Sequence, residues 1–470
     1  MLQMRNDLTA DSEDGLPVPR RWLAVAAISF GVALLVIDGQ IAIVALPTIA
    51  RELGVSSGAV TSVVTIYQLV MVMGVMPLAS LGERIGHRKL YQAGQILFCL
   101  ASIGCFFVNS FAMLLVLRTF QGLGASMAMA VNVAIIRRIY PAANLGAGLG
   151  FNSVIVASSA AIAPTLGGFI AANFPWQMVF VAAAPLAGLS LLLGRSLPEL
   201  PPTPGKSNLL ASMWSAGTMA MLVGGVQLAS HDATRLAGAI VFVLGIVSAV
   251  FLLRRESSQD RPIVPVDLMR MPAIGMSALA ALAVFLAGGA LMVSLPFRLE
   301  QGMGFASDEV GLLLLPFPLT MLFVSPFAGW LSDRVAPTKI GVPGLVVAII
   351  GLLLIAHLPD QPHFWDVAWR LSLTALGFGS FLAPNSRLLV AQTPMDRTAA
   401  AGGLLSTSRL LGQASASALV GLLLGLNLGM GMVPYYVAVG FTLVAAGSII
   451  MRFRHVRASR ARANTVDMGI

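Results

Sequence analysis

Long apolar stretches separated by short polar segments dominate the hydropathy pattern of this 470-residue chain. An α-helix needs about 20 apolar residues to cross roughly 30 Å of hydrocarbon, and fourteen stretches come close to or exceed that length. Their approximate bounds are 22–48, 58–80, 89–108, 111–135, 146–172, 177–194, 209–229, 234–253, 274–298, 307–331, 338–358, 366–391, 400–426 and 431–452. The pattern therefore predicts an all-α polytopic membrane protein with both termini on one side.

Composition agrees with this pattern and excludes soluble classes of protein. Hydrophobic residues make up 57% of the chain and charged residues 10%, against about 25% charged residues in soluble domains. The net charge of +9 does not indicate nucleic-acid binding, because the arginines lie between apolar stretches and not on a polar face. The chain has no P-loop and no metal-ligand spacing of His or Cys. We therefore expect no enzyme activity, no metal and no cofactor.

Lysine and arginine are distributed unevenly over the segments that join the stretches. If the amino terminus is cytoplasmic, 22 of the 29 basic residues fall in cytoplasmic segments. The external ones are Arg51, Arg235, Arg298 and Arg370. Because short cytoplasmic segments carry an excess of basic residues, we expect a multi-pass protein of the bacterial cytoplasmic (inner) membrane with both termini in the cytoplasm.

A short charged signature occurs twice, at 79–89 after the second stretch and at 329–339 after the tenth. A displacement of eight stretches predicts fourteen transmembrane helices arranged 6+2+6, as in a duplicated protein with two inserted helices. The predicted division is a cytoplasmic tail (1–20), a six-helix half (21–195), linkers with the inserted helices (196–273), a second six-helix half (274–453) and a second tail (454–470).

Asp38 is the one acidic residue that falls inside a predicted span, since the other nineteen lie in tails, loops or at helix ends. A carboxylate inside a membrane span is costly and usually marks a proton or substrate pathway. A structural ion pair between helices is the alternative.

Arg118 is the expected partner of Asp38 because of its depth. Asp38 lies nine residues before the outer end of the first stretch, and Arg118 lies eight residues after the outer start of the fourth. At 1.5 Å per residue both are about 12 to 14 Å deep. Arg118 could instead bond only to backbone carbonyls of a broken helix.

The polar candidates to line a substrate cavity are Gln40, Tyr67, Gln68, Asn385 and Arg409. Gln40, Tyr67 and Gln68 lie at middle depth, and each alone could serve ordinary packing. Asn385 lies nearer the cytoplasmic end of its span, and the mid-membrane Arg409 could pair with anionic groups or tie the thirteenth span to the first-half signature. In the fifth stretch, small residues and Pro164 between positions 158 and 168 would let helices approach closely, slide or bend. Simple packing is again the alternative.

The motifs together resemble the major facilitator superfamily, and within it the fourteen-span drug:proton antiporter family, over essentially the whole chain. The first copy resembles the superfamily loop signature Gly-x-Leu-Ala-Asp-Arg-x-Gly-Arg-Lys, with Glu83 and His87 as conservative departures. In the second copy, Ala336 and Pro337 replace the Gly-Arg pair of the signature. The matching residues considered as a latch are Glu83, Arg84, Gly86, Arg88, Asp333 and Arg334.

Three further elements carry the resemblance. Arg118-Thr-Phe-Gln121-Gly122 resembles the Arg-x-x-Gln-Gly element implicated in proton coupling. Ala163-Pro164-Thr-Leu-Gly167-Gly168 resembles the antiporter element Gly-Pro-x-x-Gly-Gly, with alanine for its first glycine. The stretch from Leu35 to Pro47 resembles the first-span element, with Gln40 and Ile43 in place of its Thr and Asn.

The resemblance implies proton-driven export of lipophilic drugs or toxic compounds, cationic ones included, by alternating access. Asp38, Arg118 and Gln121 would couple protons, Pro164, Gly167 and Gly168 would seal and bend the fifth span, and the signature residues would latch the halves. The implied partners are the bilayer, protons and a small lipophilic substrate, with no nucleic acid; the protein would act as a monomer, and a periplasmic adaptor is left open. A proton-coupled transporter of a metabolite, lipid or siderophore, and a non-transporting membrane sensor or scaffold, are the alternatives.

Overall fold

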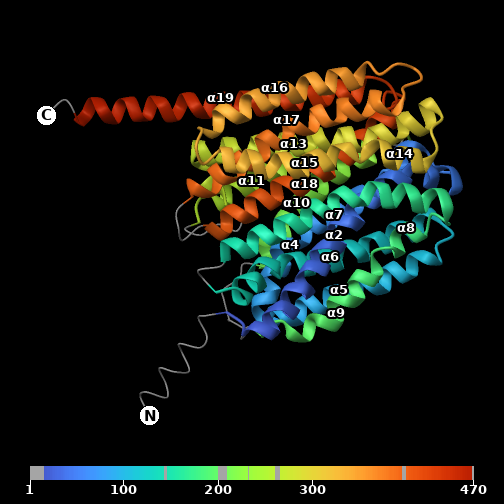
Figure 1. Cartoon of the computed structure of the whole chain (residues 1–470), viewed down its shortest axis with the longest axis horizontal. Coiled ribbons are helices and arrows are strands. Elements are labelled where there is room, and N and C mark those ends of the chain that lie inside the picture. Colours follow the sequence, from blue (N-terminus) through green and yellow to red (C-terminus); the bar gives the residue numbers. More distant parts are fainter. Residues whose placement is uncertain are drawn as a thin grey trace, which may run out of the picture.

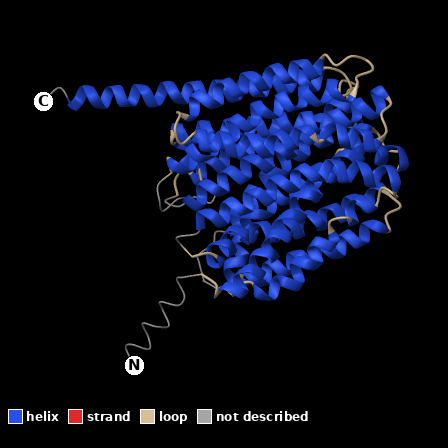
Figure 2. Ribbon diagram, in the orientation of Figure 1, coloured by secondary structure: helices blue, strands red, loops and turns tan. Residues whose placement is uncertain are grey.

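The computed structural model describes residues 15–141, 145–199, 209–230, 232–259, 265–393 and 398–467. These residues form helices and connecting loops, and no strand occurs among them (Figure 2). Helices satisfy all their backbone hydrogen bonds internally, which an apolar surrounding demands. The prediction of an all-α protein is confirmed.

The helices fall into two groups joined by a hairpin. The first group, called the first half, contains α2 (Val18–Glu52), α3 (Ser57–Val60), α4 (Ser62–Ile85), α5 (His87–Phe106), α6 (Phe111–Ile139), α7 (Leu145–Asn173), α8 (Met178–Val181), α9 (Ala184–Leu193) and the 3-10 turn η2 (Gly194–Ser196). The hairpin contains α10 (Leu209–Leu228), the 3-10 turn η3 (Asp232–Thr234) and α11 (Arg235–Glu256). The second half contains α12 (Val266–Arg270), α13 (Pro272–Phe297), the π-turn η4 (Arg298–Gly302), α14 (Ser307–Leu314), α15 (Pro316–Leu331), α16 (Pro337–Ala356), α17 (Phe364–Ala391), α18 (Thr398–Gly425) and α19 (Val433–Asp467).

Nine helical segments of the described residues are long and apolar enough to cross a membrane. Helices α5, α7, α10, α17 and α18, each of 20 residues or more, coincide with the other five apolar stretches. The 6+2+6 arrangement of fourteen spans remains a prediction.

The start of α2 and the end of α19 lie toward the same end of the bundle (Figure 1). We call this the tail end and the opposite one the far end. Helix α19 continues straight out of the bundle at the tail end as far as Asp467, so most of the segment predicted as a carboxyl-terminal tail is helical. Helix α2 begins at Val18, inside the predicted amino-terminal tail.

The first charged signature lies at a sharp junction between α4 and α5 at the tail end. Gly86 ends α4 and directly precedes α5, with φ of +101°. Side chains other than hydrogen rarely tolerate this backbone conformation. The glycine of the signature is therefore explained by the turn that it makes.

The α10–α11 hairpin is attached to both halves through α10. Val223 of α10 packs with Leu69 of α4 and with Ala414 and Ala418 of α18. Near the far end, Gln227 donates to Ser62 Oγ (2.9 Å) and accepts from Thr65 Oγ1 (3.0 Å). In contrast, most of α11 is exposed, as expected of a helix that faces lipid.

Candidate functional site

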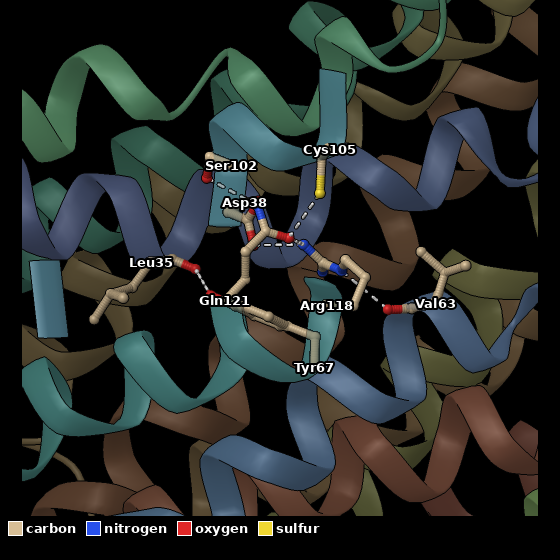
Figure 3. Close-up of polar contacts among 8 residues, drawn as sticks. All are labelled: Leu35, Asp38, Val63, Tyr67, Ser102, Cys105, Arg118 and Gln121. Carbon is tan, nitrogen blue, oxygen red and sulfur yellow. Dashed lines mark hydrogen bonds and ion pairs between the residues drawn. The ribbon is translucent and has the colours of Figure 1, made fainter. Parts of the chain in front are cut away.

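Asp38 of α2 and Arg118 of α6 form an ion pair in the interior of the first half (Figure 3). Arg118 Nη1 donates to Asp38 Oδ2 over 2.8 Å, and both side chains have 0% exposure. Removing two charges from solvent costs several kcal/mol each, and only close pairing with further hydrogen bonds offsets this cost. The structure thus brings together the two residues expected from their common depth.

Arg118 has partners other than Asp38. Its Nε donates to the carbonyl oxygen of Val63 (3.1 Å), and its Nη1 also donates to Gln121 Oε1 (2.9 Å). Its guanidinium carbon lies 4.2 Å from the ring centroid of Tyr67 and 5.1 Å from that of Phe180. These carbonyl, amide and ring contacts would continue to stabilise the cation if Asp38 became neutral.

Gln121 extends the pair toward α5. Its Nε2 donates to Ser102 Oγ over 2.9 Å, and Cys105 Sγ lies 3.8 Å from its Oε1. Because one face of α6 carries both Arg118 and Gln121, three residues apart, the same helix turn orients the arginine and anchors it to α5. Nothing in the sequence pointed to Ser102 or Cys105, which lie in an apolar stretch.

Two atoms of the pair have no hydrogen-bond partner among the described residues. They are Asp38 Oδ1 and Arg118 Nη2. The Tyr67 hydroxyl, near the carboxylate, donates to the carbonyl oxygen of Leu35 over 3.4 Å. A proton could therefore be added at Asp38 Oδ1 without displacing another hydrogen bond there.

The small residues of α7 allow close contact with helices of both halves. A Cβ on Gly167 would lie 2.6 Å from the carbonyl oxygen of Ile41, one turn beyond Asp38 on α2. A Cβ on Gly168 would lie 2.6 Å from the carbonyl oxygen of Ser307 on α14, and one on Gly311 would lie 2.8 Å from that of Pro164. Pro164, Gly167 and Gly168 thus lie where α7 connects the α2 segment near the ion pair to the second half.

A group of polar contacts between the halves surrounds Glu300 at the far end; we call it the Glu300 clasp. Glu300 Oε1 accepts from Thr48 Oγ1 (3.2 Å) and lies 3.5 Å from Arg51 Nη1, both on α2. Its Oε2 accepts from Ser307 Oγ (3.1 Å). Close by, Ser57 Oγ donates to Gln301 Oε1 (3.0 Å). The far end of the molecule is therefore closed by contacts between the halves.

The signature residues considered as a latch lie at the tail end, where the described ion pairs of Arg88 and Asp333 do not join the two halves. Arg88 pairs with Glu199 (2.6 Å), and Asp333 pairs with Arg387 of α17 (2.7 Å). Arg334 lies 3.9 Å from the ring centroid of Trp330, Glu83 is exposed near His87, and Arg84 is also exposed at the end of α4.

The cavity candidates are scattered. Tyr67 belongs to the ion-pair site, whereas Gln40 is partly exposed and Gln68 is buried on α4. The side-chain amide of Asn385 forms hydrogen bonds within the second half. Its Nδ2 donates to the carbonyl oxygen of Ser277, and its Oδ1 accepts from Arg452. Arg409 is partly exposed near the middle of α18.

Comparison with known proteins agrees with this architecture. The chain is 37% identical to the uncharacterized transporter YebQ of Escherichia coli (strain K12), over 87% of this chain and 91% of the relative. It is 27% identical to the riboflavin transporter RibZ of Clostridioides difficile (strain 630), with coverage of 83% and 85%. It is also 27% identical to the methyl viologen resistance protein SmvA of Salmonella typhimurium (strain LT2), with coverage of 86% and 83%.

Solved structures share the fold at low sequence identity. A bacterial homolog of the human lysosomal transporter Spinster superposes with a TM-score of 0.64 at 16% identity, over 93% of this chain and 96% of that one. A D-xylose-proton symporter gives 0.66 at 14%, with coverage of 91% and 97%. The family profile described as the Major Facilitator Superfamily matches residues 28–212 and 277–467, the parts of the chain on either side of most of the hairpin. The chain therefore belongs to the major facilitator superfamily of membrane transporters.

Proposed function

We propose that this protein exports lipophilic small molecules across the bacterial cytoplasmic membrane in exchange for protons, by alternating access between its two halves. The observation that carries the proposal is the fully buried Asp38–Arg118 pair, in which a single carboxylate is poised between a paired and a protonated state.

The first step of the cycle is the loading of Asp38. In the structure the far end is closed by the Glu300 clasp, and the carboxylate is neutralised by Arg118. When the far end opens, a proton binds to Asp38 and weakens its attraction to Arg118. Arg118 remains bonded to Val63 and Gln121, so the aspartate is the group that changes state and the arginine stays in place.

The second step transmits this change to the halves. Asp38 and Thr48 lie on the same helix, so a shift of α2 at the ion pair moves the clasp residues as well. Gly167 and Gly168 place α7 in contact with the same helix and with α14. The packed elements have two arrangements, and proton and substrate bind them with different affinity.

Two relatives whose names refer to drug resistance or efflux favour the export mode. SmvA is a methyl viologen resistance protein, and LfrA of Mycolicibacterium smegmatis, 27% identical to this chain, is a multidrug efflux pump. Transport of a metabolite is the second candidate, which the relation to the riboflavin transporter RibZ favours equally. In both cases we propose that the tail end faces the cytoplasm.

Counterflow in proteoliposomes separates the two modes. We would reconstitute the purified protein in one orientation, impose a pH gradient, and follow riboflavin together with lipophilic dyes of positive, negative and no charge. Movement of a dye against the proton flux supports export by antiport. Movement of riboflavin or a dye in the same direction as the protons supports uptake. A rate of substrate movement that is the same with and without the pH gradient contradicts proton coupling.

A further inference from the structure

Arg409 is a mid-membrane cation that the ion-pair site does not use. Counting along the helices at about 1.5 Å per residue, it lies about 18 Å from Gly421, which contacts Thr61 near the far end. Asp38 lies about 15 Å from Thr48 of the Glu300 clasp by the same count. Arg409 and Asp38 are therefore at similar depths, one in each half.

No described residue forms a hydrogen bond or an ion pair with Arg409. Asp38, the acid at this depth, is already neutralised by Arg118. The other arginines of the second half described above are engaged: Arg387 pairs with Asp333, and Arg452 bonds to Asn385 and Ser277. Among the described side chains near mid-membrane, the Arg409 guanidinium is thus an uncompensated positive charge.

Arg409 lies on a stretch of α18 that packs against several other helices. Helix α18 packs against α4 and α10 through Ala414 and Ala418, and against α13 through Gly412 and Ala416. No residue from Leu404 to Gly425 belongs to the exposed class, yet Arg409 keeps part of its surface accessible. The Arg409 side chain is therefore partly accessible on a helix that is otherwise packed among its neighbours.

We infer that Arg409 binds the anionic group of the transported molecule, so that the preferred substrates are amphiphiles with a carboxylate or a similar acid. A partly desolvated guanidinium without a partner favours a carboxylate, to which it can donate two hydrogen bonds. Gly412, three residues beyond Arg409 on α18, packs against Leu282, Phe285 and Leu286 of α13. This inference rests on the proposed function in one respect, which is that the transported molecule passes between the two halves.

The same charge disfavours lipophilic cations. With Asp38 neutralised by Arg118, no described carboxylate pairs with Arg409 to offset repulsion of a positive ligand. We therefore expect this chain to differ in charge preference from its relative SmvA, which is named for resistance to the dication methyl viologen.

The first test uses three fluorescent anthracenes that differ only at position 9: a carboxylate, a carboxamide and an aminomethyl group. Binding to the purified full-length protein is measured by fluorescence polarisation. Wild type should bind the carboxylate about tenfold or more tightly than the other two. Arg409→Gln should lose this preference and keep its affinity for the carboxamide, and Arg409→Lys should keep part of the preference. Equal affinities, a preference for the amine, or a carboxylate preference that survives in Arg409→Gln would overturn the inference.

A second test does not depend on any substrate. Gln413 lies one helical turn beyond Arg409 and is partly exposed, so Gln413→Cys can be reacted with an anionic and a cationic methanethiosulfonate in membrane vesicles. The unmodified chain gives the background from Cys99 and Cys105. The anionic-to-cationic rate ratio should fall at least about tenfold in Arg409→Gln and stay high in Arg409→Lys. An unchanged ratio, or no reaction of the introduced thiol, refutes a positive, accessible site even if none of the anthracenes binds.

These tests fail separately from the proposed function. If Asp38→Asn leaves transport coupled to protons but the anionic preference depends on Arg409, proton antiport through Asp38 is wrong and the anion site stands. If Asp38→Asn abolishes proton coupling and wild type shows no preference for anionic ligands, proton antiport through Asp38 stands and the anion site at Arg409 is wrong.

Discussion

At the residue scale, the central feature is the unequal support of the two charges in the ion pair. Arg118 has a carbonyl, an amide oxygen and two aromatic rings in addition to Asp38. Asp38 Oδ1 has no hydrogen-bond partner in the described part of the chain. The arginine can therefore remain buried through the cycle while the aspartate changes its protonation, a division of roles that a simple structural ion pair would not require.

Replacing Arg118 by lysine should reduce proton-coupled transport at least about tenfold. Lysine keeps the charge, but a single ammonium cannot reproduce the separate bonds of Nε to Val63 and of Nη1 to Asp38 and Gln121. Transport is measured as dissipation of a pH gradient in vesicles with equal amounts of protein. Thr119→Ala, on the exposed side of the same helix turn, is the control and should leave the rate within about twofold. Full activity of Arg118→Lys would mean that the bond geometry is unimportant.

Some of this residue-level picture could be predicted from the sequence. Asp38 is the single acid in a predicted span, and the depth argument led to Arg118. The roles of Ser102, Val63 and Phe180 could not be predicted, because apolar stretches give no information on how helices are rotated about their axes. Asn385 was predicted as a cavity candidate, but its polarity is used by Arg452 and Ser277, contacts that depend on three helices meeting.

At the element scale, α2 connects the ion pair to the contact between the halves. The helix carries Asp38 near its middle and the clasp residues Thr48 and Arg51 close to its far end. Glu300 lies in a short turn between two apolar stretches, so the sequence suggested an ordinary loop acid. Its partners on α2, Thr48 and Arg51, are about 250 positions away in the chain, and only the packing of the halves reveals them.

Removing the Glu300 carboxylate should destabilise the closed far end. Glu300→Ala removes bonds to Thr48, Ser307 and Arg51 together. The measurement is disulfide formation between Ser57→Cys and Gln301→Cys, whose native side-chain oxygens are 3.0 Å apart. We expect cross-linking to slow several-fold in Glu300→Ala. Asp308→Ala, an exposed acid of the neighbouring helix α14, is the matched control, and identical rates in both variants would exclude a role of the clasp in closure.

A methyl group on Gly168 should also favour opening of the far end. It would lie 2.6 Å from the carbonyl oxygen of Ser307 and 2.8 Å from the Cα of Gly311, distances at which the two halves must move apart. Thr48→Cys, buried between the halves, should then react several-fold faster with a membrane-impermeant maleimide added on the far side. The control is Gly224→Ala on α10, where nothing lies within 4 Å of an added Cβ. An unchanged labelling rate of Thr48→Cys in the Gly168→Ala variant would show that close contact between α7 and α14 is not needed to keep the far end closed.

At the scale of the whole molecule, two helical halves meet at the far end, and the α10–α11 hairpin packs against both through α10 (Figure 1). The apolar stretches and the repeated signature predicted the helical class and the duplication. They could not predict the conformation, because the same stretches serve every state of a transporter. In this far-end-closed state Arg88 pairs with Glu199, in the segment that follows η2, and Asp333 pairs with Arg387 of α17.

The most direct test of the central claim is proton antiport by wild type and Asp38→Asn in inverted membrane vesicles energised by respiration. The lumen is acidified, lipophilic compounds of each charge are added, and the pH gradient is followed with a fluorescent dye. The account predicts that a transported compound dissipates the gradient with wild type and with the exposed-acid control Asp308→Asn, but not with Asp38→Asn, although all three proteins are folded in the membrane. Undiminished dissipation by Asp38→Asn would contradict the claim that this carboxylate carries the proton.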